Sequence, residues 1–180
     1  MWRWLALVSV LWAGSAGAVQ LSGRTALGYA QAIGGPDGLA LSFGAGNLVI
    51  EGIVGFQYEA FADTTRAAEA AFDLGLAAHF QVLRAEWAAL TVGARFNLLT
   101  GPYDDGGNVV DVLQWGVDLP LRVYWFPLPN ISLHSELGLS VQPGPADGAL
   151  TGGLTPDGLR INAFNGGGLM GGLGLSFWWG

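Results

Sequence analysis

Residues 114 to 142 read QWGVDLPLRVYWFPLPNISLHSELGLSVQ, and this stretch decides the fold. Every second residue from Trp115 to Trp125 is apolar, and the same period returns from Ile131 to Val141, where Ser135 is the exception. A period of two indicates a β-strand with one apolar face and one polar face. The two runs are joined by residues 127–130, which read PLPN, so the stretch predicts an antiparallel hairpin.

The rest of the chain repeats this pattern. Eight alternating segments are expected at residues 20–31, 39–45, 48–59, 72–82, 90–98, 114–125, 131–142 and 168–179. The first segment is the least regular, with Leu21, Leu27 and Tyr29 in phase. Eight consecutive strands predict an all-β, antiparallel, up-and-down barrel.

The expected connections alternate between short and long. Short turns fall at 46–47, 84–86 and 127–130, whereas the longer connections at 32–38, 60–69, 100–113 and 143–163 hold most of the turn-forming and acidic residues. Short turns on one side and long loops on the other are typical of transmembrane β-barrels of the outer-membrane type. Both chain termini are then expected on the short-turn side.

Alternation alone does not say which face of the sheet points outward. A soluble lipocalin-like barrel would place the apolar set inside and the other set in water. That other set is mostly small residues, and the chain has no Lys and only 12% charged residues, far below the roughly 25–35% of a typical soluble surface. Trp115 and Trp125 bracket about 25 Å of a tilted strand, the height of a lipid-facing apolar band. We therefore expect a transmembrane barrel with its apolar face toward lipid.

Composition sets the remaining bounds. The 180 residues amount to one domain, and the net charge of −7 argues against nucleic-acid binding. The absence of Cys excludes disulfides, thiol chemistry and a lipoprotein anchor. Residues 1–18 combine a basic head, an apolar run and a small-residue cleavage motif at Ala16-Gly17-Ala18, which predicts a cleavable signal peptide followed by a barrel domain over 19–180.

These features together resemble the small eight-stranded outer-membrane β-barrel proteins of Gram-negative bacteria. The OmpA transmembrane domain, OmpX and OmpW-type proteins belong to this class. The resemblance covers the whole expected mature chain and rests on the strand pattern, the loop asymmetry and the aromatic-ended last strand. It implies localisation in the bacterial outer membrane and assembly by the barrel-assembly machinery through the C-terminal strand.

The candidate functional residues lie at the strand positions that are expected to face the lumen. A lumenal polar network is expected from Glu51, Asp73, His79, Arg95, Asp118, Arg122, His134 and Glu136. Charged groups in a narrow lumen must be paired, so the network is interpreted as structural filling. The alternative interpretation is a gate or a ligand contact.

Two chemical alternatives use the same face. Ser132, His134 and Glu136 form an inward row that could suggest lipid acyl transfer, but neighbours in such a row lie about 6.6–7 Å apart. His79 and His134 could join Asp73 or Glu136 around a metal, although two His without further spacing are weak evidence. We expect no catalysis, no metal and no cofactor.

The outward phase and the loops carry the expected contacts. An aromatic girdle is predicted from Trp115, Trp125, Phe177 and Trp179. The acidic stretch Asp104-Asp105-Gly106-Gly107-Asn108 lacks the spacing of a calcium loop and is expected to be a solvated surface loop.

The expected function is that of a monomeric integral outer-membrane barrel with a structural or surface-contact role. Its partners would be outer-membrane lipid and lipopolysaccharide, the latter contacted through divalent cations at the acidic loops. The alternatives are a narrow OmpW-like conduit or binding site for small apolar molecules, a lipid A acyl-modifying enzyme, and a secreted lipocalin-like binder.

Overall fold

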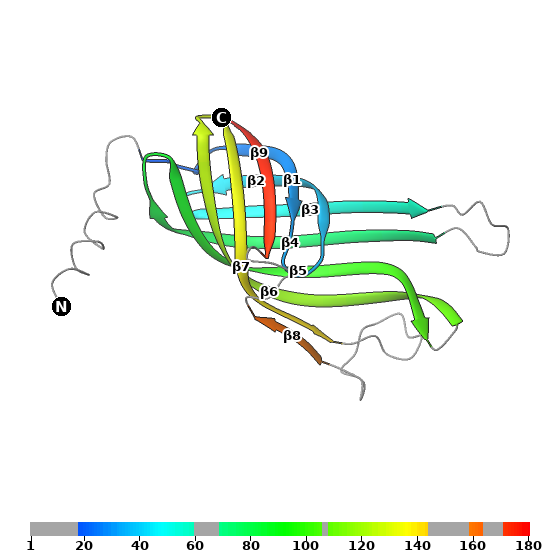
Figure 1. Ribbon diagram of the computed structural model, residues 1–180. Helices are drawn as coiled ribbons and strands as arrows, with labels where there is room; N and C mark the ends of the chain where they lie inside the picture. The colour runs from blue at the N-terminus through cyan, green and yellow to red at the C-terminus, as the bar shows by residue number, and fades with distance from the viewer. Residues whose placement is uncertain (1–17, 60–68, 106–107, 144–158, 164–170) are drawn as a thin grey trace, which may run out of the picture.

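The computed structural model describes residues 18–59, 69–105, 108–143, 159–163 and 171–180 (Figure 1). The predicted signal peptide lies outside these residues, apart from Ala18. Among the described residues, no helix is long and apolar enough to cross a bilayer.

The described residues form nine strands. They are β1 (Thr25–Gln31), β2 (Asp37–Ala45), β3 (Leu48–Glu59), β4 (Glu69–Arg84), β5 (Ala88–Asp105), β6 (Asn108–Leu128), β7 (Ile131–Pro143), β8 (Leu159–Ala163) and β9 (Gly172–Trp179).

The sheet closes into a barrel of eight antiparallel strands. Each of β1 to β7 pairs with the next strand along the chain, and β9 pairs with both β7 and β1, which closes the ring. The short strand β8 pairs with the outer end of β7, where it continues the line of β9. The predicted eight-stranded antiparallel barrel is confirmed.

Three expected boundaries are wrong. The first strand begins at Thr25, and Leu21 is fully buried inside the barrel instead of sharing the outward phase of Leu27. Most of the expected loop at 100–113 is strand, because β5 and β6 stay paired as far as Asp105 and Asn108. The expected connection at 143–163 ends in a strand, β8.

The outer face of the barrel is apolar and the inner face carries the charges. Outward side chains such as Leu41, Val54 and Phe177 are 47–56% exposed, while Glu51, Arg95, Asp118, Arg122 and Glu136 are at most 2% exposed. A closed barrel with such a wall satisfies every backbone hydrogen bond within the bilayer while presenting hydrocarbon to lipid. The predicted transmembrane orientation is therefore confirmed, and the soluble-barrel alternative is not supported.

The two ends of the barrel differ. Short turns join β2 to β3, β4 to β5 and β6 to β7 at one end, called here the base, and Gly46 adopts a positive φ of 62° in the first of them. Gly180 and the segment 18–24 also lie at the base, since a Cβ on Gly180 would lie 2.7 Å from the carbonyl oxygen of Gly23. Strands β3 to β6 extend far beyond β1 and β9 at the opposite, outer end (Figure 1).

Candidate functional site: a lumen closed at three levels

The middle of the lumen is filled by a cluster of five charged side chains, called here the ionic cluster. It consists of Glu51 from β3, Arg95 from β5, Asp118 and Arg122 from β6, and Glu136 from β7. Alternation along each strand directs these residues inward, and the barrel curvature brings them together across the axis.

Arg122 lies at the centre of this cluster. Its Nη1 and Nη2 donate to the two carboxylate oxygens of Glu51 at 2.5 and 2.7 Å. Its Nε and Nη2 donate to Oε2 of Glu136 at 3.0 and 2.8 Å, and Nη1 also donates to the Tyr124 hydroxyl at 2.9 Å. A planar guanidinium with five donors suits this bridging role, which a lysine ammonium could not fill.

Arg95 makes the second bridge. Its Nη1 and Nη2 each donate to a different oxygen of Glu136 at 2.7 Å, and Nη1 reaches Oδ2 of Asp118 at 3.2 Å. Asn97 donates from Nδ2 to the same Asp118 oxygen at 2.7 Å. Glu136 therefore accepts from both arginines at once and links β5, β6 and β7 across the lumen.

The remaining members of the predicted network lie around this cluster or apart from it. His79 is buried with its Nε2 3.8 Å from Oε1 of Glu51. His134 packs its ring 5.4 Å from that of Tyr124 and has no hydrogen-bond partner among the described residues. Asp73 is only partly buried, and no ion pair among the described residues joins it to the cluster.

The arrangement does not bring the suggested catalytic or metal-binding sets together. Ser132 accepts a hydrogen bond at 2.8 Å from Nε1 of Trp178, and Glu136 accepts hydrogen bonds from both arginines. Within the described part of the chain, no three His, Asp or Glu side chains are grouped as a metal site requires.

The base of the lumen is closed by an apolar plug that the sequence analysis did not identify. Tyr124, Phe126 and Trp178 point inward and pack ring against ring, with centroid separations of 6.0–6.4 Å. Leu21 and Val49 complete the buried group. The signal was present in the sequence, because Trp178 shares the inward phase of Ser176 and Phe126 shares that of Tyr124.

The segment 18–24 holds this plug in place by crossing the base. The amide of Val19 donates to the Ala85 carbonyl at 2.8 Å, and the Gln81 side chain donates to the Val19 carbonyl at 3.1 Å. On the other side, Gly44 lets the backbone of Leu21 approach, since a Cβ there would lie 1.9 Å from the Leu21 oxygen.

Arg24 ties the same segment to the β6–β7 turn. Its Nη2 donates to the Pro129 carbonyl at 2.7 Å, and its guanidinium lies 5.8 and 5.7 Å from the ring centroids of Phe126 and Trp178. Partial burial lowers the pKa of Arg24, but an arginine remains charged in proteins, so the cation–π contacts persist.

The outer end of the lumen is closed by the β1–β2 connection, residues 32–36, called here the inner loop. This connection was expected only as one of the longer loops, and it folds inward: the Ile33 amide donates to Oε1 of Glu136 at 2.9 Å. The Gln142 side chain donates to the Gly34 carbonyl. Gly34 lies so close to Asn97 and Asp118 that a Cβ would lie 2.2 Å from each.

The four predicted girdle residues lie on the outer wall. Trp125, Phe177 and Trp179 lie near the base, and Phe177 stacks on Trp179 with ring centroids 6.2 Å apart. Trp115 lies higher on β6 and stacks on Phe96 at 6.4 Å.

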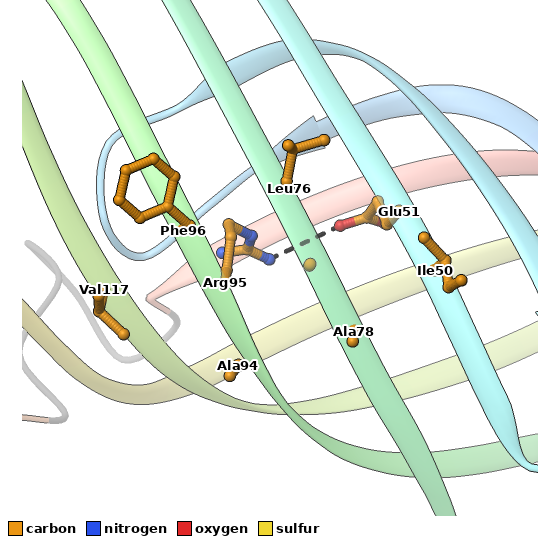
Figure 2. A pocket seen from close by; sticks show the side chains of 9 residues that line it. Ile50, Glu51, Leu76, Ala78, Ala94, Arg95, Phe96 and Val117 are labelled. Atoms are coloured by element: carbon orange, nitrogen blue, oxygen red, sulfur yellow. Dashed lines mark ion pairs between the residues drawn. The ribbon is translucent and has the colours of Figure 1, made fainter.

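Between these aromatic levels the wall has a shallow hollow of about 460 Å³ (Figure 2). Small side chains at Ala78 and Ala94 form its floor, and Leu76 and Phe96 stand above them (Figure 2). Arg95 and Glu51, which face each other at 3.7 Å, also line this hollow, so buried charge lies directly beneath the lipid-facing residues.

Comparison with known proteins gives likenesses of shape only. No family model matches the chain, and the comparison with curated proteins gives no significant match. The N-terminal β-barrel domain of Pseudomonas aeruginosa OprF aligns with 87% of this chain and 96% of its own, at 10% identity and a TM-score of 0.47. Ail, the attachment invasion locus protein of Yersinia pestis, aligns over 88% and 99% at 14% identity and a TM-score of 0.44. Neisserial surface protein A aligns over 86% and 92% at 13% identity and a TM-score of 0.46.

The barrel itself carries the structural conclusion. Eight antiparallel strands, an apolar wall and a charged, filled lumen are the features of the outer-membrane type of barrel. The chain therefore has the fold of the small outer-membrane β-barrels that its strand pattern resembles, and the outer membrane is its location.

Proposed function

We propose that the chain is a non-enzymatic, monomeric outer-membrane protein with a structural or surface-contact role and no open channel. The observation that carries this proposal is the closure of the lumen at three levels: the apolar plug, the ionic cluster and the inner loop. A conduit needs a continuous open path through the lumen, and each level fills the lumen with side chains or backbone independently of the other two.

The filled lumen also weighs against the alternative of a conduit for small apolar molecules. Such a molecule would have to displace the bidentate pairs of Arg122 with Glu51 and of Arg95 with Glu136. These pairs are buried, and separating them would cost a large free energy because each charge would be left without a partner. Acyl transfer is not favoured either, because Ser132 and His134 are turned toward Trp178 and Tyr124 inside the barrel.

The proposed partners follow from the outer surface. Outer-membrane lipid would cover the apolar wall, and the acidic segments at the outer end would meet lipopolysaccharide through divalent cations. The final strand, β9, would be the part read by the barrel-assembly machinery, since it ends in the outward pair Phe177 and Trp179.

Single-channel recording in planar bilayers tests the proposal. Protein folded in detergent and added to the bilayer is expected to give no discrete conductance steps, with a general porin as the positive control. Folding of the same sample is verified by its altered gel migration before boiling. Reproducible steps that a small apolar compound blocks would overturn the closed-barrel proposal and favour the conduit.

A further inference from the structure

The apolar belt on the outer wall is not equally tall around the barrel. On β3 the outward apolar residues run from Leu48 to Tyr58, and on β6 they run from Trp115 to Trp125. A strand tilted by about 40° rises about 2.5 Å per residue along the barrel axis, so each of these belts is about 25 Å tall. This face, called here the high wall, matches the hydrocarbon layer.

The belt is much shorter on the adjoining strands β9, β1 and β2, called here the low wall. On β1 only Leu27 and Tyr29 are apolar in the outward phase, between Thr25 and Gln31. On β2 the outward apolar run starts at Phe43 and ends at Leu39, and on β9 it covers 173–179. None of these runs is taller than about 15 Å by the same conversion.

The difference lies at the outer end of the barrel. At the base β2 and β3 begin and end together, because Ala45 pairs with Leu48. At the outer end the last pair between β2 and β3 joins Leu39 to Val54, while Phe56 and Tyr58 continue above it, 72% and 62% exposed. The inner loop adds no height, because it turns into the lumen instead of extending the wall.

Tilting the barrel cannot remove this mismatch. A tilt moves the belt of one face up and the belt of the other face down, but it does not lengthen the shorter belt. A flat bilayer would therefore submerge Gln31, which is exposed, and Asp37, its cross-strand partner, in hydrocarbon. Bilayers relieve such a mismatch by thinning locally around the shorter surface.

We propose that the low wall thins the membrane locally, so that the outer-leaflet headgroups descend to the level of Gln31 and Asp37. The occupant of this face is bilayer lipid in a compressed state, because the face is apolar below this level and polar at it. This inference rests on the proposed function, that of an integral outer-membrane barrel, and adds a specific surface with a specific effect on lipid.

Spin labels on the low wall and the high wall test the inference. The chain has no Cys, so Gln31→Cys and Phe56→Cys each give one labelling site, on the low and high walls respectively. Registers through Tyr29, Leu39 and Val54 make Gln31 the counterpart of Phe56 along the hydrogen-bond ladder. Because the strands are tilted, this ladder rises by about 3 Å per strand toward the outer end, so Gln31 lies about 6 Å lower than Phe56. The labelled proteins are folded into dioleoyl phosphatidylcholine vesicles, and collisions with oxygen and with a water-soluble nickel chelate are measured.

The expected result is an oxygen-to-nickel collision ratio several-fold higher for the Phe56→Cys label than for the Gln31→Cys label. Equal ratios, or a higher ratio for the Gln31→Cys label, would overturn the inference, because in a flat bilayer the lower of the two positions lies at least as deep in hydrocarbon. A Gln31→Cys label that is immobile and shielded from both reagents would also overturn it, since a protein would then cover the face.

A third label, Ile50→Cys, separates this result from failure of the membrane placement. Ile50 lies outward in the lower half of the high wall and must read as hydrocarbon in any transmembrane barrel. A water-like reading at Ile50 would contradict the membrane placement itself.

Discussion

Glu136 is the residue on which the ionic cluster most depends, because it accepts from Arg95, Arg122 and the Ile33 amide. We predict that Glu136→Gln lowers the free energy of unfolding by about 3–5 kcal/mol, since two buried guanidinium groups lose their shared carboxylate. Urea titration of the barrel folded in lipid vesicles measures the loss.

The control for this substitution is Glu86→Gln, which removes the same charge from an exposed position in the β4–β5 turn. It is expected to change stability by less than about 0.5 kcal/mol. Similar effects of the two substitutions would show that the cluster does not hold the strands together.

Leu21 makes a separate prediction at the base. Its side chain is fully buried among the plug aromatics, so Leu21→Ala is expected to cost about 2–5 kcal/mol through lost contacts and a residual cavity. Leu128→Ala, at the exposed end of β6, is the matched control. Equal urea midpoints for the two variants would mean that segment 18–24 does not pack into the barrel.

At the scale of single elements, the inner loop is the least expected feature. Gly34→Ala would place a methyl group 2.2 Å from Asn97 and Asp118, so we predict that the loop is displaced and that stability falls by about 1–3 kcal/mol. A cysteine introduced at the buried Ser140 should then react faster with a maleimide than it does in the otherwise native chain.

Gly101→Ala serves as the control for this experiment, because a Cβ there would make only an ordinary 3.6 Å contact with Ala71. Gly101→Ala is expected to leave the maleimide reaction rate at position 140 unchanged. If Gly34→Ala also leaves that rate unchanged, the inner loop is not the outer closure of the lumen.

The elements also show what the sequence could and could not reveal. Alternation located the strands and correctly predicted that Arg95, Arg122 and Glu136 point inward. This prediction succeeds because successive side chains of a strand always point to opposite faces of the sheet. It could not reveal that residues 18–24 and 32–36 fold into the lumen. Their positions depend on contacts with Ala85, Gln142 and Glu136, which are remote in sequence and have no periodic signal.

The full lengths of β5 and β6 were not predicted, for a different reason. Residues 100–113 contain Gly, Pro and several Asp, which sequence rules associate with loops. In the barrel, β5 and β6 continue through them as a two-stranded extension, because each strand supplies the other's backbone hydrogen bonds. Pairing across the hairpin therefore overrode local composition.

At the scale of the whole molecule, the barrel consists of one wall and one lumen. The wall presents apolar side chains to lipid, and the lumen is closed by an apolar plug, an ionic cluster and an inner loop. This combination predicts a stable barrel that conducts no ions and that acts through contacts at its surface and not through transport. The unequal height of the wall adds a distinct effect on the surrounding bilayer.

The most direct measurement compares spin labels at two neighbouring positions on β3. Ile53 and Val54 are both apolar, yet Ile53 is fully buried in the lumen and Val54 is 47% exposed on the wall. In vesicles, a label at Val54→Cys is predicted to collide with membrane-dissolved oxygen far more often than a label at Ile53→Cys. Equal collision rates, or a higher rate at Ile53→Cys, would contradict the orientation of the barrel wall.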